Sequence, residues 1–114
     1  MTWVRVETNV PDNDKVQGFA AALGIAIPQA VGHIVCVWGK VADHRWTGNL
    51  KDVLDDTLET WALWSGERGA FARAFRGAFM RGDRLQGWRD RQGKLIERLQ
   101  KDRRRKNRRA EDDA

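Results

Sequence analysis

The chain has few residues suited to sulfur chemistry and none of the long apolar runs that enter membranes. Cys36 is the only cysteine, so an internal disulfide and a zinc site built from several cysteines are excluded. It lies in the apolar run from Val31 to Trp38, where buried thiols are common, and we expect it in the core. No apolar stretch approaches the ~20 residues that a membrane-spanning helix needs. The N-terminus has no basic patch followed by an apolar run, so we expect a cytoplasmic protein that does not contact membranes.

Groups for catalysis and metal binding are also sparse. His33 and His44 have neither the spacing nor the company of metal ligands, and we interpret both as structural. The segment 66–69 lacks the Gly-Lys-Ser/Thr that completes a phosphate-binding loop. We expect no enzyme activity, no cofactor and no metal. Four acidic residues share one side of a predicted helix, and we interpret them as a solvated face: Asp52, Asp55, Asp56 and Glu59.

The net charge of +5 comes entirely from the C-terminal end. Residues 1–88 hold ten Lys/Arg and ten Asp/Glu, whereas residues 89–114 hold eleven Lys/Arg and six Asp/Glu. A chain of 114 residues is long enough for one core. We therefore expect one folded domain over residues 1–100 and a basic, disordered tail over residues 101–114. The sharpest cationic cluster is in this tail: Arg103, Arg104, Arg105, Lys106, Arg108 and Arg109.

The apolar pattern of the N-terminal half predicts one strand and two helices. Apolar and polar residues alternate over residues 3–7, and Pro11 ends this strand. A first helix, capped by Asp12 or Asp14, runs to Leu23 and stops at Gly24. A second helix runs from Pro28 to about Asp43, with apolar residues every three or four positions.

The C-terminal half predicts a turn with a brief extended segment over 46–50, a helix over 54–62, a helix over about 67–77, and a hairpin over 79–88 around a Gly-Asp turn. A further helical pattern begins at Arg89 and continues to Leu99. We expect Trp38, Trp61 and Trp88 in the core rather than as stacking platforms for bases, and Trp46 has no assigned role.

From Pro28 onward, the predicted elements follow the order of a winged helix-turn-helix, in which the last helix enters the DNA major groove and the hairpin follows the backbone. The predicted fold is therefore mainly α with a small β-hairpin: a winged helix-turn-helix with an extra N-terminal helix and a basic C-terminal helical tail. The preceding acidic helix makes us expect a polarised body, with one face that meets phosphates. The arginines expected on that face are Arg68, Arg73, Arg76, Arg81 and Arg84.

An apolar strip near the C-terminal end bears on assembly. Such a strip must either fold back on the body or pair with another copy. We favour a homodimer, because two copies would double the phosphate contacts; the monomer with the strip folded back is the alternative. The strip consists of Trp88, Leu95, Ile96 and Leu99.

Taken together, these residues resemble the N-terminal domain of phage replication initiators and replisome organisers. The resemblance rests on the segments 3–6, 23–25, 30–35 with Trp38, 48–50, 64–66, 87–88 and 93–98, followed by the basic tail. It implies a winged helix that binds double-stranded DNA at an origin and recruits a helicase or its loader. The sequence departs from the family at the hairpin exit, residues 85–88, and lacks the partner-binding domain into which full-length initiators continue. The chain is then either a truncated form of such an initiator or, as the alternative function, a stand-alone phage protein that uses this fold to inhibit or adapt a host protein.

Overall fold

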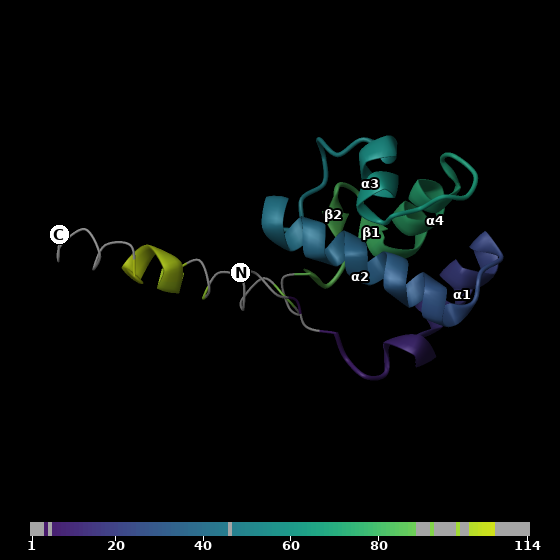
Figure 1. Cartoon of the computed structure of the whole chain (residues 1–114), viewed down its shortest axis with the longest axis horizontal. Helices are drawn as coiled ribbons and strands as arrows, with labels where there is room; N and C mark the ends of the chain where they lie inside the picture. Colours follow the sequence, from purple (N-terminus) through teal and green to yellow (C-terminus); the bar gives the residue numbers. More distant parts are fainter. Residues whose placement is uncertain are drawn as a thin grey trace.

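The structure of the chain is a computed structural model that describes residue 4, residues 6–45, 47–88, 92, 98 and 101–106. Figure 1 shows a helical body with one small antiparallel hairpin, which confirms the predicted mainly α class. Its elements in chain order are the 3-10 helix η1 (Val10–Asp12), the helices α1 (Asp14–Leu23), α2 (Ile27–His44), α3 (Asp55–Trp61) and α4 (Ala70–Phe79), and the strands β1 (Met80–Arg81) and β2 (Arg84–Leu85).

The start of α1 differs in detail from the prediction. Its cap is Asn13, whose side-chain oxygen accepts hydrogen bonds from the backbone N–H groups of Lys15 at 2.9 Å and Val16 at 3.4 Å. Asp12 is already part of η1, and Asp14 is the first residue of α1. Asn13 is therefore the extended residue whose side chain can reach the first free N–H groups of the helix. The predicted end of α1 at Gly24 is confirmed, with a left-handed φ of 66°.

The predicted N-terminal strand is wrong over the residues that the structure describes there. Val4, Val6 and Glu7 pair with no strand, and Val6 is exposed. Pro11 lies inside η1 instead of ending a strand. The alternation is only five residues long, and the β2 edge of the hairpin is taken by Asn49. A strand without an edge to pair with has no ladder of hydrogen bonds to stabilise it.

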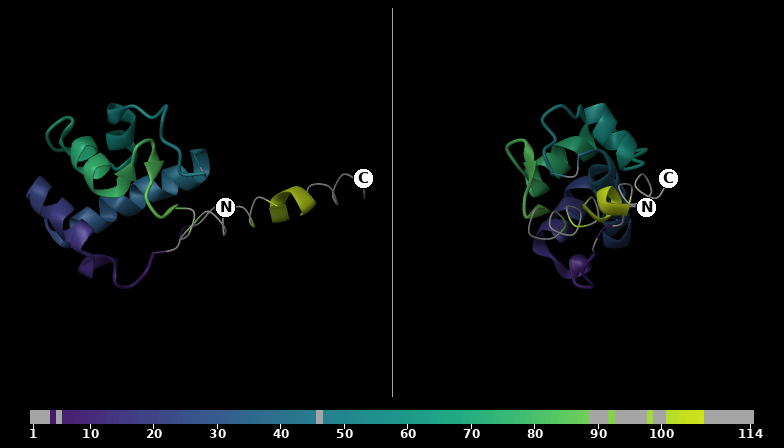
Figure 2. Two further views of the ribbon diagram at one scale, coloured as in Figure 1. Left: turned by 180° about the vertical axis from the view of Figure 1, so that it is seen from behind. Right: turned by 90° about the vertical axis from the view of Figure 1, so that its left-hand side faces the viewer.

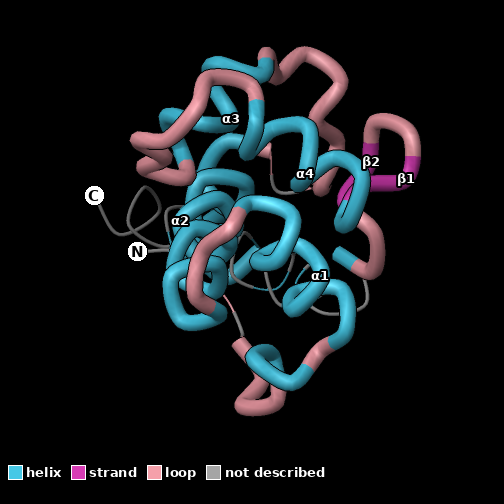
Figure 3. Tube along the Cα trace, turned by 90° about the vertical axis from the view of Figure 1, so that its right-hand side faces the viewer, coloured by secondary structure: helices cyan, strands magenta, loops and turns pink. Residues whose placement is uncertain are grey.

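The core is centred on the packing of α4 against α1. Phe19 of α1 meets two α4 rings edge-on, with ring centroids 5.4 Å from Phe71 and 5.2 Å from Phe79. Phe75 stacks on Phe71 at 5.7 Å, so this cluster uses all four phenylalanines of the chain. Figure 3 shows α4 between α1 and α3, with the hairpin at its flank. This packing covers the Phe71 side of α4 and leaves the opposite side to solvent.

The remaining core predictions are mostly confirmed. Trp38 and Trp88 are buried, whereas Trp61 is half-buried and stacks on His44 with ring centroids 5.9 Å apart. Cys36 is only half-buried, so the expectation of a core thiol was too strong. Its position on α2 lies beside the most buried face of the helix, not on it.

The segment from Gly48 to Leu50 joins the hairpin as a single bridge. Asn49 pairs with Arg84, and the backbone N–H of Leu50 donates to the carbonyl of Asp83 at 2.7 Å. The N–H of Leu85 donates to the carbonyl of Gly48 at 3.0 Å. The brief extended segment predicted here therefore lies beside β2, on the side away from β1.

Trp88 packs directly on Gly48. Gly48 has a φ of 81°, and a Cβ atom there would lie 2.6 Å from Cδ1 of Trp88. Trp88 was expected in a dimer strip, but it is buried against its own chain, as in the fold-back alternative. The other predicted members of the strip, Leu95, Ile96 and Leu99, lie outside the described residues, as does Trp46.

Residues 101–106 have helical backbone and exposed side chains, as expected of the basic helical tail in the predicted fold. The rest of the tail lies outside the described residues. The boundary at residue 100 stays a prediction. Figure 2 shows this short helix from two further sides.

The contact between Gly48 and Trp88 makes a stability prediction. Gly48→Ala is expected to lower the free energy of unfolding in two ways. An alanine in the left-handed conformation costs about 1 to 2 kcal/mol, and overlap of its Cβ with the indole of Trp88 costs about 1 to 3 kcal/mol more. The matched control is Gly24→Ala, which has the same backbone penalty with no atom within 4 Å of the new Cβ. Urea unfolding followed by tryptophan fluorescence measures both. Equal losses in the two variants would contradict the close packing of Trp88.

Candidate nucleic-acid interface

The N-terminus of α4 is capped by a carboxylate from α3. Gly69, the residue before α4, has a φ of 86° and no side chain that could cap the helix. The two oxygens of Glu59 accept hydrogen bonds from the N–H of Gly69 at 2.8 Å and from the N–H of Ala72 at 3.1 Å. Two of the free donors of α4 are thus satisfied, and the negative charge lies at the positive end of the helix dipole.

This role of Glu59 corrects the prediction of a solvated acidic face. Glu59 is buried, unlike the exposed Asp52, Asp55 and Asp56. The sequence carried no usable sign of it, because the capped N–H groups lie ten and thirteen residues further along the chain. The capping motifs that can be recognised in a sequence join residues only three apart.

Two of the predicted DNA-binding arginines are paired with the same acidic helix. Arg68 makes a two-pronged contact with Asp56, at 3.1 and 2.6 Å. The hydrogen bonds and the charge of Arg68 hold the pKa of Asp56 below its ordinary value, and those of Asp56 raise the pKa of Arg68. The pair is therefore fully ionised at neutral pH. Its stabilisation would be lost only as the pH falls through the lowered pKa of Asp56, and solvent screening keeps it small.

Arg76 is held more firmly, between α4 and the chain that leads into α3. Its guanidinium donates to Asp55 Oδ1 at 2.8 Å and to the backbone carbonyl of Val53 at 2.7 Å, and it lies 3.7 Å from the sulfur of Met80. The side chain is only 31% exposed. The expected separation of an acidic face from a basic one is therefore wrong for Arg68 and Arg76, because the two helices contact each other through these charges.

The other three predicted body arginines are exposed and form no salt bridge with any described residue: Arg73, Arg81 and Arg84. Arg73 lies on the solvent side of α4 with Gly77. Arg81 and Arg84 are cross-strand partners in the hairpin, so two like charges stand opposite each other. Figure 3 shows this hairpin at the flank of α4, at the edge of the body.

Part of the predicted cationic tail is also described. Arg103, Arg104, Arg105 and Lys106 are exposed on the helical segment 101–106, and Arg108 and Arg109 lie outside the described residues. On the described tail, Asp102 is the acidic neighbour. The accessible members of the predicted set therefore fall into two groups, one on α4 and the hairpin and one on the tail.

The turn between α3 and α4 is fixed by aromatic packing. The indole N–H of Trp64 donates to the carbonyl of Glu67 at 3.0 Å, and its ring lies so close to Gly66 that a Cβ there would come within 2.4 Å. His33 bonds through Nδ1 to the carbonyl of Ala62 at 2.7 Å, in agreement with the structural role that we expected. These contacts hold the start of α4 against α2.

Comparisons with protein-family models, with curated proteins and with solved structures gave no match for this chain. Within the part of the chain that the structure describes, no three His, Cys, Asp or Glu side chains gather where they could hold a metal ion. No described helix is long and apolar enough to cross a membrane alone; α1 and α2 reach that length only as a pair bent by 103°.

The cap on α4 can be tested through stability. Glu59→Gln keeps one acceptor oxygen but leaves one N–H of α4 unpaired. It should therefore lower the free energy of unfolding by about 1 to 3 kcal/mol, and Glu59→Ala should lower it further. Glu67→Gln is the control, because Glu67 is exposed and only its backbone carbonyl is used; it should change stability by less than about 0.5 kcal/mol. Urea unfolding and hydrogen exchange at Gly69 and Ala72 give the readout. Equal effects of Glu59→Gln and Glu67→Gln would refute the cap.

Proposed function

We propose that this chain is a winged helix-turn-helix protein that binds double-stranded DNA through the phosphates of its backbone. The order α2, segment 48–50, α3, α4, β1, β2 supports this fold, and so does the pairing of segment 48–50 with β2. In this assignment α4 is the recognition helix and the hairpin is the wing. The helix α1 is the additional N-terminal element, packed along α4.

The observation that carries the proposal is the pair of opposed arginines on the wing. Like charges directly opposite each other on two strands destabilise the hairpin. No described carboxylate forms a salt bridge with either Arg81 or Arg84. An anion bound between the guanidinium groups would remove this repulsion, and arginine forms two parallel hydrogen bonds to phosphate. A DNA backbone supplies such anions at regular spacing.

The tail adds affinity without sequence information. Exposed cations such as those over 103–106 release counterions when they meet phosphates, whatever the bases are. Base reading by α4 would fall mainly on Arg73, since Arg68 and Arg76 are engaged by α3. The recognition of an origin and the recruitment of replication proteins remain expectations from the family resemblance.

The wing predicts a specific salt dependence. Log affinity falls as log salt concentration rises, and each phosphate contact makes this negative slope steeper by about 0.9. Replacing an arginine that contacts a phosphate should therefore make the slope less steep by that amount. Arg84→Gln is expected to do this while leaving stability unchanged or raised, because it removes the like-charge pair. Arg68→Gln is the control, since it removes the same charge from an arginine already paired with Asp56. Fluorescence anisotropy with a labelled duplex at several salt concentrations measures both slopes.

Two results would count against the proposed wing. If Arg84→Gln and Arg68→Gln lower the slope alike, the hairpin has no special role. If the wild-type chain does not bind duplex DNA even at low salt, DNA binding itself is refuted. A protein partner then becomes the better candidate, which the structure favours through two exposed leucines at the ends of α3, Leu54 at 71% and Leu63 at 73% exposure.

A second prediction separates the two arginines of α4. Arg73→Ala should leave stability unchanged and alter the preference among duplex sequences by about 1 to 3 kcal/mol, if Arg73 reads a base. Arg76→Ala should instead lower the free energy of unfolding by about 1 to 3 kcal/mol, because its bonds to Asp55 and Val53 are lost. Removing residues 101–114 should weaken binding to all sequences alike. Competition between duplexes of different sequence measures the preference, and urea unfolding measures the stability. If Arg73→Ala also weakens binding to all sequences alike, the protein is a non-specific binder and the hypothesis of origin recognition is refuted.

A further inference from the structure

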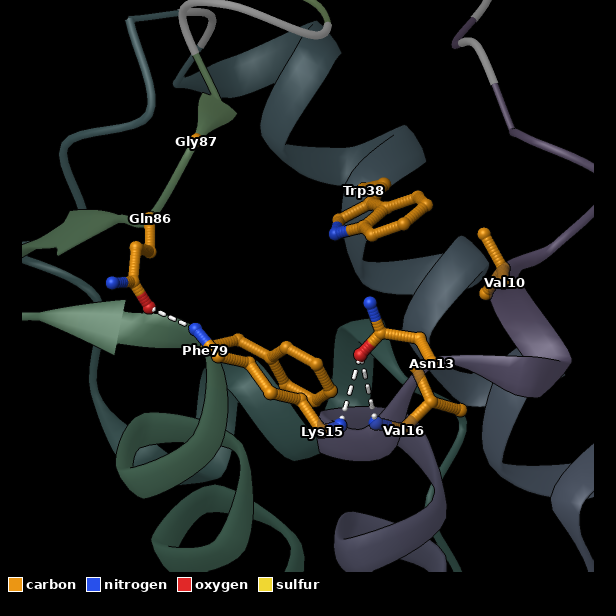
Figure 4. A pocket seen from close by; sticks show the side chains of 8 residues that line it. All are labelled: Val10, Asn13, Lys15, Val16, Trp38, Phe79, Gln86 and Gly87. Carbon is orange, nitrogen blue, oxygen red and sulfur yellow. Dashed lines mark hydrogen bonds between the residues drawn. The ribbon is translucent and has the colours of Figure 1, made fainter.

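A cavity of about 270 Å³ lies where α1, α2 and the base of the hairpin meet. Figure 4 shows that its lining comes from four places: the start of η1 with the cap and first turn of α1, the middle of α2, the last residue of α4, and the exit of β2. The volume is close to the lower end of the range for small-molecule sites, about 300 to 1,000 Å³. The cavity is thus large enough for a compact organic ligand.

The apolar part of the lining suits an aromatic ring. Trp38 and Phe79 are two of its walls, and Val10 and Val16 complete the apolar surface. Ring pairs in offset or edge-on geometry contribute about 0.5 to 1.5 kcal/mol beyond the area that they bury. The walls are also fixed, because Trp38 is buried in α2 and Phe79 packs on Phe19.

Among the residues that line the cavity, the polar side chains are Asn13, Lys15 and Gln86, and none is acidic. Nζ of Lys15 donates to Gln86 Oε1 at 2.5 Å, and an ammonium group has two further protons to offer. In Figure 4 the side-chain nitrogen of Asn13 and the indole nitrogen of Trp38 both point toward the space between them. The oxygen of Asn13 is already used as the cap of α1, so only its NH₂ group is free to bind a ligand.

The acidic residues nearest in sequence do not change this balance. Asp12 and Asp14 flank Asn13 but neither lines the cavity, and both are exposed to solvent. Both carboxylates are in contact with water, which reduces their repulsion of an anion in the cavity. A positive charge at the rim, neutral donors within and apolar walls together favour a ligand with one anionic end and one aromatic end.

We propose that this cavity binds a small aromatic carboxylate, with the carboxylate on Lys15 and Asn13 and the ring against Trp38 and Phe79. This ligand site goes beyond DNA binding and does not depend on it. The bound ligand would connect α1 with the base of the hairpin. There the N–H of Gln86 donates to the carbonyl of Phe79 at 2.8 Å and closes the turn out of α4.

The test uses two probes of equal shape and different charge, 1-naphthoate and 1-naphthamide, titrated into the whole chain labelled with ¹⁵N. The indole N–H signal of Trp38, assigned by its loss in Trp38→Phe, reports on the cavity directly. We expect 1-naphthoate to shift this signal and to bind about tenfold more tightly than 1-naphthamide, the preference that one charge-assisted hydrogen bond provides. Lys15→Met should abolish the preference and keep the weak binding of the amide.

Lys40→Met is the matched control, because Lys40 is an exposed lysine of α2 that does not line the cavity; it should keep the tenfold preference. Three outcomes would overturn the proposal. The first is that neither probe shifts the Trp38 signal at millimolar concentration. The second is that both probes bind equally well to the wild-type chain. A Trp38 signal that moves with protein concentration alone would identify a second copy of the chain as the occupant. All three are independent of whether the protein binds DNA.

Discussion

The arrangement of the candidate interface depends on the two hydrogen bonds that the Glu59 carboxylate accepts from the start of α4. Gly69 supplies the left-handed turn into α4 but cannot cap it, so the cap has to come from another element. Since Glu59 lies on α3, the cap also fixes how α3 and α4 are placed relative to each other. The same carboxylate neutralises the positive end of α4. The N-terminus of α4, a natural position for a phosphate, is thereby already occupied by an anion of the protein itself.

The ion pairs between α3 and α4 extend this internal neutralisation. Asp56 pairs with Arg68 in the turn before α4, and Asp55 pairs with Arg76 near the end of α4. The acidic helix α3 therefore neutralises two arginines of the neighbouring segment, and does not form a separate acidic face. Of the arginines on α4 and the hairpin, those that remain exposed without a described salt bridge are Arg73, Arg81 and Arg84. The proposed phosphate contacts therefore lie on the hairpin and the tail more than on α4.

How well the sequence predicts each feature depends on how far apart in the chain the interacting residues are. The apolar spacing that predicts α2, and the Gly-Asp turn that predicts the hairpin, are local signals, and both elements form close to the expected residues. The structural role of Glu59 and the pairing of Arg76 depend on contacts between helices, which no spacing within one helix shows. The alternation at residues 3–7 predicts a strand correctly only if an edge is free to receive it. The choice of Asn13 over Asp12 or Asp14 as the cap depended on η1, a turn that the pattern did not reveal.

The cavity and the hairpin share one part of the fold, and this decides how far a ligand could influence the proposed binding of DNA. Phe79 and Gln86 line the cavity, and their backbone hydrogen bond closes the base of the strands that carry Arg81 and Arg84. A ligand at Lys15 and Trp38 touches neither arginine, so it can act only by changing how often this base is formed. A ligand shifts such an equilibrium by no more than the difference between its affinities for the two states. Because the walls of the cavity belong mainly to the rigid α1–α2–α4 core, most of the binding energy is the same in both states. Within the lining, the side-chain hydrogen bond between Lys15 and Gln86 joins α1 to the hairpin exit, so a ligand that engages Lys15 acts on the base of the hairpin through this bond.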